Sequence, residues 1–262
     1  MDMNYDDHLA DDSARFVQAL RTAQPGAQVP SCPEWDADDL LWHLATVQAF
    51  WARIVRDRIT DGDEVRRGGE ERPGDRAGLL AYFDQASGEL RAALAEADDA
   101  TPAWTWADDH SVGFIRRRQA HEALIHRVDA ELTAGSRTPM DPALCADGVE
   151  EALRVMYGGA PDWGTFTPDD AATIRVTATD TKDSWLVALG RFRGTDPDGT
   201  VVDESDIRVL DGDPGQASAS VEGTAADLDC WLWHRPTEGP VARVGDPEAL
   251  SGLEAVLASP IN

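Results

Sequence analysis

The chain has 262 residues, with 49 acidic and 23 basic side chains and a formal net charge of -26. This acidity argues against nucleic acid or an anionic membrane as a partner, because both attract basic surfaces. The sequence shows neither an apolar run of the roughly 20 residues that span a bilayer nor a basic and then apolar signal pattern at its start. We therefore expect a cytoplasmic protein, as a monomer or a homodimer.

Cysteine usage agrees with a reducing compartment. The chain holds three cysteines, Cys32, Cys145 and Cys230. Their odd number and wide spacing fit reduced thiols better than a framework of disulfides.

From about residue 7 to residue 160, apolar side chains recur at intervals of three and four, which predicts helices. A first helix contains Phe16 and Leu20, and the following ones span about 37–58, 76–97 and 112–133, with a further one ending near 157. The polar, glycine-rich stretch 60–75 reads as an exposed loop. This pattern predicts an up-and-down four-helix bundle, a fold that often builds metal sites from inward side chains. We assign residues 1–158 to this helical domain.

The remaining residues, 159–262, predict a smaller α+β domain. Short alternating runs rich in β-branched residues, bounded by Asp, Gly and Pro, indicate strands of an antiparallel sheet. These strands fall at about 172–177, 184–189, 207–209, 217–221 and 241–244. Two helices are expected as well, at 225–233 after Thr224 and at 247–257, where a proline opens the helix.

Two histidines and a glutamate predict a metal site. On the helix 112–133, Glu122 and His126 are four residues apart and share one face, so both side chains can reach one ion. His121 and His126 are five apart and lie too far around the helix to act as the two histidines of a metalloprotease motif. His43 is the best third ligand, because it sits in the other long apolar helix that carries a histidine. Such a set, with positions left open, is typical of a catalytic site.

Four motifs, taken together and in this order, resemble the mycothiol-dependent maleylpyruvate isomerase family. They are Val29-Pro30-Ser31-Cys32-Pro33-Glu34-Trp35, Asp39-Leu40-Leu41-Trp42-His43-Leu44, His121-Glu122 with His126-Arg127 and Asp129, and Asp227-Leu228-Asp229-Cys230-Trp231-Leu232-Trp233-His234-Arg235. The resemblance spans nearly the whole chain. It implies a DinB-like helical metal-binding domain followed by a sterol-carrier-protein-like α/β domain.

The same resemblance implies roles for individual residues. His43, Glu122 and His126 match the family's zinc ligands. Arg235 matches an arginine of the second domain that reaches the active site, and we expect it to bind and orient the substrate as a catalytic residue. The family usually has glycine before that arginine, whereas this chain has His234.

Several neighbouring residues are candidates for supporting roles. Asp129 could accept the proton of the other ring nitrogen of a ligand histidine, or it could pair with Arg127. In the run Arg116-Arg117-Arg118, Arg118 is the candidate for binding an anionic group of the substrate. We expect His110 and His121 to lie outside the ligand set.

We expect an enzyme that activates a low-molecular-weight thiol, mycothiol, for attack on a small electrophile. Zinc is the first choice of metal, with nickel, iron or manganese as alternatives. Of the two outcomes that such a thiolate allows, S-transfer is placed ahead of cis–trans isomerisation. A non-catalytic metal-binding regulatory module and a hydrolase with Glu34 or Asp109 as general base are the remaining alternatives.

Overall fold

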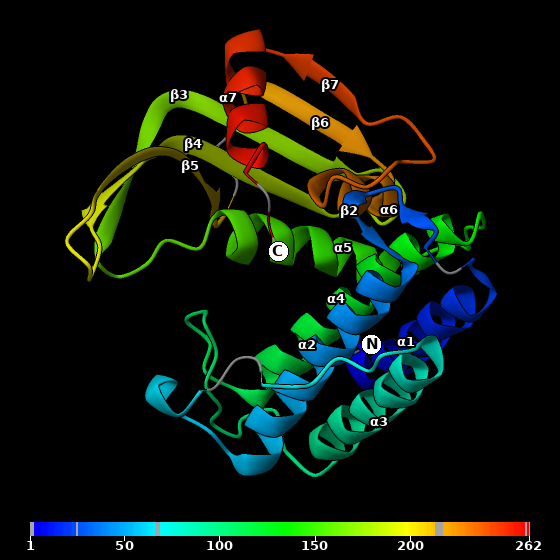
Figure 1. The fold of residues 1–262 in the computed structure, drawn as a ribbon. Coiled ribbons are helices and arrows are strands. Elements are labelled where there is room, and N and C mark those ends of the chain that lie inside the picture. The colour runs from blue at the N-terminus through cyan, green and yellow to red at the C-terminus, as the bar shows by residue number, and fades with distance from the viewer. Residues whose placement is uncertain (1–2, 25, 66–68, 213–216, 260, 262) are drawn as a thin grey trace. The chain divides into compact units, whose positions relative to one another are not determined.

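Four long helices form the first of two units in this computed structural model, which describes residues 3–24, 26–65, 69–212, 217–259 and 261 (Figure 1). Each begins at a side chain that caps free backbone N–H groups: Asn4, Asp36, Asp75 or Ser111. The predicted helices are confirmed. They are α1 (Tyr5–Thr22), α2 (Ala37–Asp57), α3 (Arg76–Ala95) and α4 (Val112–Thr133), joined by the hairpin β1 (Gln28–Val29) and β2 (Cys32–Asp36) and by the short 3-10 helix η1 (Gly62–Glu64).

The helices do not alternate in direction, so the predicted up-and-down order is wrong. Arg76, at the start of α3, pairs with Asp38 at the start of α2, and Arg56 at the end of α2 pairs with Glu89 of α3, so these helices run parallel. The loop 58–75 permits this, because it can extend over roughly 60 Å while α3 is roughly 30 Å long. Residues 66–68 of that loop lie outside the described residues.

The second unit is the predicted α+β fold, with a five-stranded sheet in the order β5-β4-β3-β6-β7. Its pairs are antiparallel except β3 with β6, which is parallel, so the sheet is mixed. The strands are β3 (Gly164–Ala178), β4 (Ser184–Thr195), β5 (Val201–Leu210), β6 (Ala219–Gly223) and β7 (Ala242–Gly245), and the helical elements are α5 (Pro142–Glu151), the π-helix η2 (Ala152–Tyr157), α6 (Ala225–Leu232) and α7 (Pro247–Leu257). The first three strands are longer than predicted, because their ends continue to pair with the neighbouring strands, with a register shift in β3 between Pro168 and Thr173.

The two units are residues 1–139 and 140–262, whereas the sequence analysis put the domain boundary after residue 158. The difference is α5 with η2. Leu144, Cys145 and Val149 of α5 are fully buried, and α5 packs on α6 of the second unit. A helical pattern alone predicts the helix but not the unit that buries its apolar face.

The core of the helical unit includes buried side chains of both helices that carry the predicted ligands, α2 and α4. Its fully buried side chains include Phe16 and Leu20 of α1 and Leu40, Leu41 and Leu44 of α2. The three cysteines form no disulfide with one another. Among the described residues, no helix combines the length and the apolar character needed to cross a membrane.

Candidate metal centre

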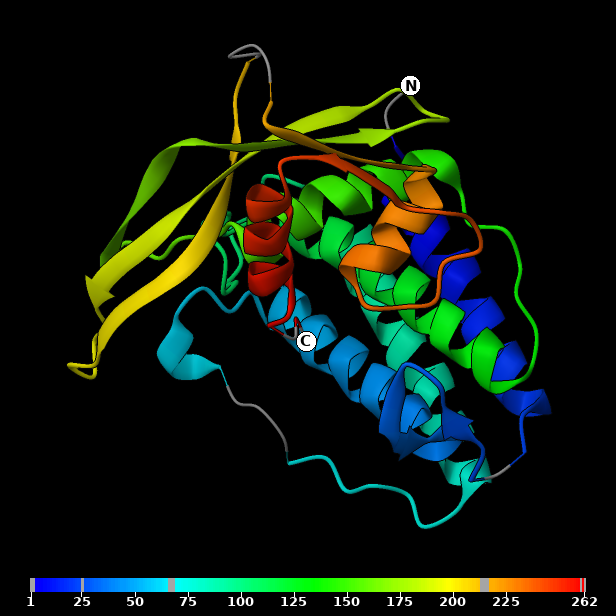
Figure 2. The same cartoon turned by 90° about the horizontal axis from the view of Figure 1, so that it is seen from above.

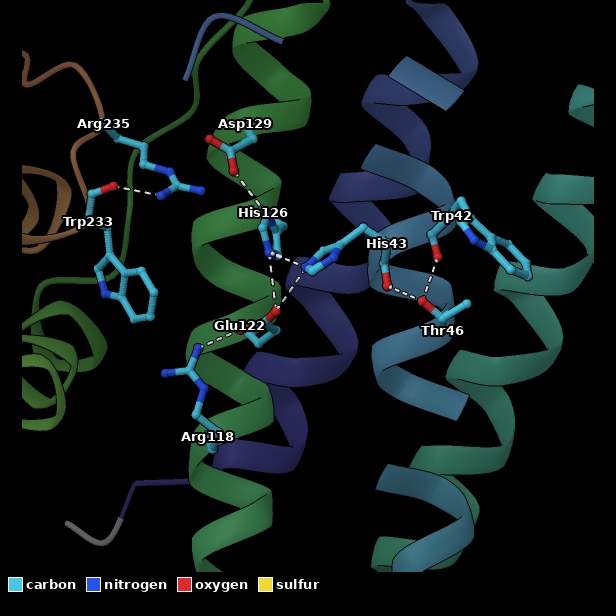
Figure 3. Close-up of polar contacts among 9 residues, drawn as sticks. All are labelled: Trp42, His43, Thr46, Arg118, Glu122, His126, Asp129, Trp233 and Arg235. Atoms are coloured by element: carbon cyan, nitrogen blue, oxygen red, sulfur yellow. Dashed lines mark hydrogen bonds and ion pairs between the residues drawn. The ribbon is translucent and has the colours of Figure 1, made fainter. Parts of the chain in front are cut away.

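The structure brings the three predicted ligands together from α2 and α4. Asp36 and Asp39 form a capping box that fixes the start of α2, and His43 follows two turns later. On α4, Glu122 and His126 are one turn apart. The three side chains point toward one another in Figure 3. Within the described residues, they form a group of the kind that can hold a metal ion.

The separations of the three ligand atoms match those around a bound ion. His43 Nε2 lies 3.1 Å from His126 Nε2 and 3.4 Å from Glu122 Oε1. His126 Nε2 lies 3.2 Å from the same oxygen. Ligands about 2.0–2.1 Å from a tetrahedral zinc ion are about 3.3–3.4 Å from one another. The triangle of two imidazole nitrogens and one carboxylate oxygen therefore fits zinc, and three protein ligands leave one of the four tetrahedral positions for a further ligand.

Contacts behind the triangle orient its members. Asp129, which is fully buried, accepts a hydrogen bond at 2.9 Å from Nδ1 of His126, so Nε2 is turned toward the other two predicted ligand atoms. Arg118 donates to Oε2 of Glu122 at 2.7 Å, which leaves Oε1 directed at the histidines. The two alternatives for Asp129 are thus separated, because Arg127 instead binds Asp12 at 3.2 Å and Thr138 at 2.9 Å.

The charges of the metal-free site compensate one another. Burial opposes ionisation of Glu122, yet the two histidines and Arg118 hold the pKa of this carboxyl well below its ordinary value. Burial also disfavours the charged form of His126, but the carboxylates of Glu122 and Asp129 outweigh this effect and raise its pKa to about 9. A proton on His126 thus occupies the place that a cation would take, and metal binding near neutral pH must release it.

This raised pKa predicts how the stability of the metal-free protein depends on pH. Since the pKa of His126 is higher in the folded than in the unfolded chain, its contribution is complete below about pH 6.5 and is lost as the pH rises through 9. We expect the free energy of unfolding in excess chelator to fall by about 3 kcal/mol between pH 6.5 and 9.5. Urea titrations measure this fall, and a His126→Gln variant should show little of it. An equal fall in that variant would assign it to other groups.

Two contacts of the site were missed by the sequence analysis. The ring of Trp35 packs on the ring of His43, with 4.7 Å between centroids. The hydroxyl of Ser31 donates to Oδ1 of Asp129. Both residues belong to the first of the four motifs, so the motif itself was a signal. The partner of Ser31, Asp129 on α4, is 98 residues away in the chain, whereas the partner of Trp35 is His43 on the adjoining helix α2.

The other candidates lie elsewhere or have other partners. His121 is buried against Tyr5, and His110 is near Thr105, so both are outside the ligand triangle as expected. Arg118 is buried and pairs with Glu122, so its predicted contact with an anionic substrate group stays a prediction. Arg116 neutralises Asp6 and Asp99.

In the second unit, the backbone before Arg235 takes the form that a glycine would favour. His234 has a left-handed φ of 58°. The N–H of His234 donates to the carbonyl of Trp231, and the N–H of Arg235 donates to that of Cys230, which is the Schellman ending of a helix. The imidazole of His234 lies 3.3 Å from the hydroxyl of Tyr157. The replacement of the family's glycine therefore preserves the turn, and the reach of Arg235 into an active site stays a prediction.

This turn makes a prediction about stability. A β-branched residue tolerates a left-handed backbone poorly, so His234→Val should lower the free energy of unfolding by about 1–2 kcal/mol. In His234→Gly, relief of the strain of the left-handed backbone offsets the greater conformational freedom of glycine in the unfolded chain. The free energy of unfolding should therefore change by no more than about 1 kcal/mol. Urea unfolding of both variants measures the difference. A valine variant as stable as the original would contradict the left-handed turn.

Comparison with known proteins agrees with the motifs. The family model for the mycothiol maleylpyruvate isomerase N-terminal domain matches residues 7–131. The family model for the C-terminal domain of the same family matches residues 143–252. No curated protein matches the sequence.

Two crystal structures have a similar fold, that of the mycothiol-dependent maleylpyruvate isomerase and that of a histidine-to-alanine mutant of it, with TM-scores of 0.60 and 0.61. Each is 12% identical and covers 93% of this chain and 95% of its own. Because the two family models match in order and leave little of the sequence outside them, the chain belongs to the mycothiol maleylpyruvate isomerase family.

Proposed function

We propose that this protein is a metal-dependent enzyme that uses mycothiol to isomerise an unsaturated dicarboxylate-like substrate of the maleylpyruvate type from cis to trans. The ligand triangle of His43, Glu122 and His126 is the observation that carries this proposal, since its separations suit a zinc ion with a position left open. Membership of a family named for this isomerase supports the choice of thiol and of reaction.

The sequence analysis placed S-transfer ahead of isomerisation, and the comparisons favour the reverse order. Both the family and the two similar crystal structures carry the name of the isomerase. The alternatives with other chemistry gain less. Among the described residues, the group that could hold a metal contains neither Glu34 nor Asp109, so nothing observed favours either of them as a hydrolytic base.

The residues of the chain divide the task. His43, Glu122 and His126 hold the ion, Asp129 keeps Nδ1 of His126 protonated, and Arg118 fixes the second oxygen of Glu122. When bound, a zinc ion lowers the pKa of a coordinated thiol, so that the thiolate is available near neutral pH. Glu122 has its pKa held low, which keeps it charged and able to bind a cation throughout the neutral range.

In the proposed reaction, the mycothiol thiolate adds to one carbon of the substrate double bond and the electron pair moves into the adjacent carbonyl. The bond that has become single rotates. The electron pair then returns, the thiolate leaves, and the trans double bond forms, so the thiol is recovered unchanged. Arg235 would bind the substrate carboxylate and hold that end of the molecule during the rotation.

The fate of the thiol separates isomerisation from S-transfer. Zinc-loaded protein is mixed with maleylpyruvate and a small amount of mycothiol, and the products are followed by proton NMR. The proposal predicts many turnovers per thiol, with no loss of mycothiol and no activity when glutathione replaces it. Consumption of one thiol per product, with a thioether adduct, would instead establish the S-transferase. If the zinc-loaded protein catalyses neither reaction, this result would favour the non-catalytic regulatory module.

A further inference from the structure

The hairpin formed by residues 28–36 lies between α1 and α2 in the chain and contacts both helices that carry the predicted ligands, α2 and α4. Its strands pair Gln28 with Asp36 and Val29 with Cys32, and the side chain of Gln28 donates to the carbonyl of Pro33. The N–H of Ala37 also donates to the carbonyl of Ala27 at 2.9 Å. The hairpin ends at Asp36, which caps α2, so its position is tied directly to the helix of His43. Figure 2 shows the hairpin beside the beginning of α2.

At its turn, the hairpin is also tied to α4. Ser31 donates its hydroxyl hydrogen to Oδ1 of Asp129, whose other oxygen accepts from Nδ1 of His126. Asp129 is fully buried, so the direction of its carboxylate depends on such partners and not on water. The hydroxyl of Ser31 therefore contributes to the orientation of a ligand that it does not touch.

At its far strand, the hairpin meets the other histidine. Trp35 lies against His43 with an angle of 41° between the ring planes. The side chain of His43 is 30% exposed, against 9% for His126, so less of the protein surrounds it. The contact with a large and half-buried ring restricts the rotamers that His43 can take.

We propose that the hairpin 28–36 is a positioning device for the metal centre, in which Ser31 orients His126 through Asp129 and Trp35 holds His43. The inference rests on the proposed metal site. It assigns the first motif, which no ligand explains, to a function: one segment of nine residues fixes both histidines, one from each helix. Ser31 and Trp35 are thus positioning residues. Their loss should weaken metal binding more than it lowers the stability of the fold.

The affinity for Zn²⁺ tests the role of Ser31. In competition with a chromogenic chelator, Ser31→Ala should raise the Kd for Zn²⁺ by 10- to 100-fold, which is about the range for residues that support a metal ligand. Ser31→Thr keeps the hydroxyl and should recover most of the affinity. Ser87→Ala, which removes the same atom from a buried serine on α3, should leave the Kd unchanged. The Tm of the metal-free protein reports folding in each variant.

The spectrum of Co²⁺ bound in place of zinc tests the role of Trp35. Trp35→Leu should broaden or shift the visible bands and speed the loss of the ion by about 10-fold, because His43 no longer keeps one orientation. Variants that bind Zn²⁺ and Co²⁺ as the original does would overturn the inference while the metal centre stands. An original protein that takes up neither ion would overturn the proposed metal centre, and this inference with it.

Discussion

Replacing His126 by alanine is expected to abolish both metal retention and activity. His126 supplies one of three ligand atoms, and structural zinc sites bind with roughly 10–16 kcal/mol in total. Losing about 4 kcal/mol of this corresponds to an affinity roughly 1,000-fold weaker. Glu122 also loses one of the groups that hold its pKa low, while His43 and Arg118 remain beside it. Metal content after dialysis, measured by mass spectrometry, and isomerase turnover both report the loss.

Two further variants make this result interpretable. His126→Gln keeps a side chain of similar size that can still donate to Asp129, so it separates the loss of a ligand from the loss of a buried hydrogen bond. His110→Ala removes an exposed histidine outside the triangle and should retain both metal and activity. Full metal content in His126→Ala, or an equal loss in His110→Ala, would refute the ligand assignment.

Replacing Arg235 by alanine is expected to lower kcat/KM by roughly 10- to 100-fold while the metal content stays unchanged. A hydrogen bond to a charged group contributes about 1.5–3 kcal/mol, and a carboxylate bound by arginine is such a group. The side chain also donates to the carbonyl of Trp233 at 2.6 Å, a contact that limits its freedom at the helix end. Steady-state kinetics on maleylpyruvate measure the effect.

The substitution needs controls for charge and for folding. Arg235→Lys keeps the charge but not the paired donors, so it should fall between the original and the alanine variant. Arg191→Ala removes an arginine that pairs with Asp203 on the sheet and should leave kcat/KM unchanged. Equal kinetics for Arg235→Ala and the original would show that Arg235 does not contact the substrate.

The elements of the fold were largely predictable from local patterns, and their directions were not. The period of three and four predicted the four long helices within a few residues, and alternation predicted the strands of the sheet in the second unit but not the hairpin of β1 and β2. Whether α3 runs with or against α2 depends on pairs such as Arg76 with Asp38, which no local pattern specifies. The parallel pair of β3 and β6 was missed for the same reason, since the two strands are separated in the sequence by β4 and β5.

The grouping of His43, Glu122 and His126 could be predicted because helix geometry and motif spacing both point to it. Glu122 and His126 are on one face by their spacing, and His43 followed from the resemblance as well as from its helix. The contacts that support these residues were harder to predict from the sequence. Asp129 was a candidate with two possible partners, and only the fold shows that it faces His126. Ser31 is 98 residues away from that aspartate, so a contact between them has no local signal.

The most direct test of a metal centre that activates thiol is X-ray absorption of the zinc-loaded protein with and without mycothiol. The account predicts two nitrogen and one carboxylate oxygen ligands from the protein, at about 2.0–2.2 Å, and a sulfur at about 2.3 Å once mycothiol is added. Failure of the protein to take up zinc, or a spectrum that stays unchanged when mycothiol is added, would contradict this account.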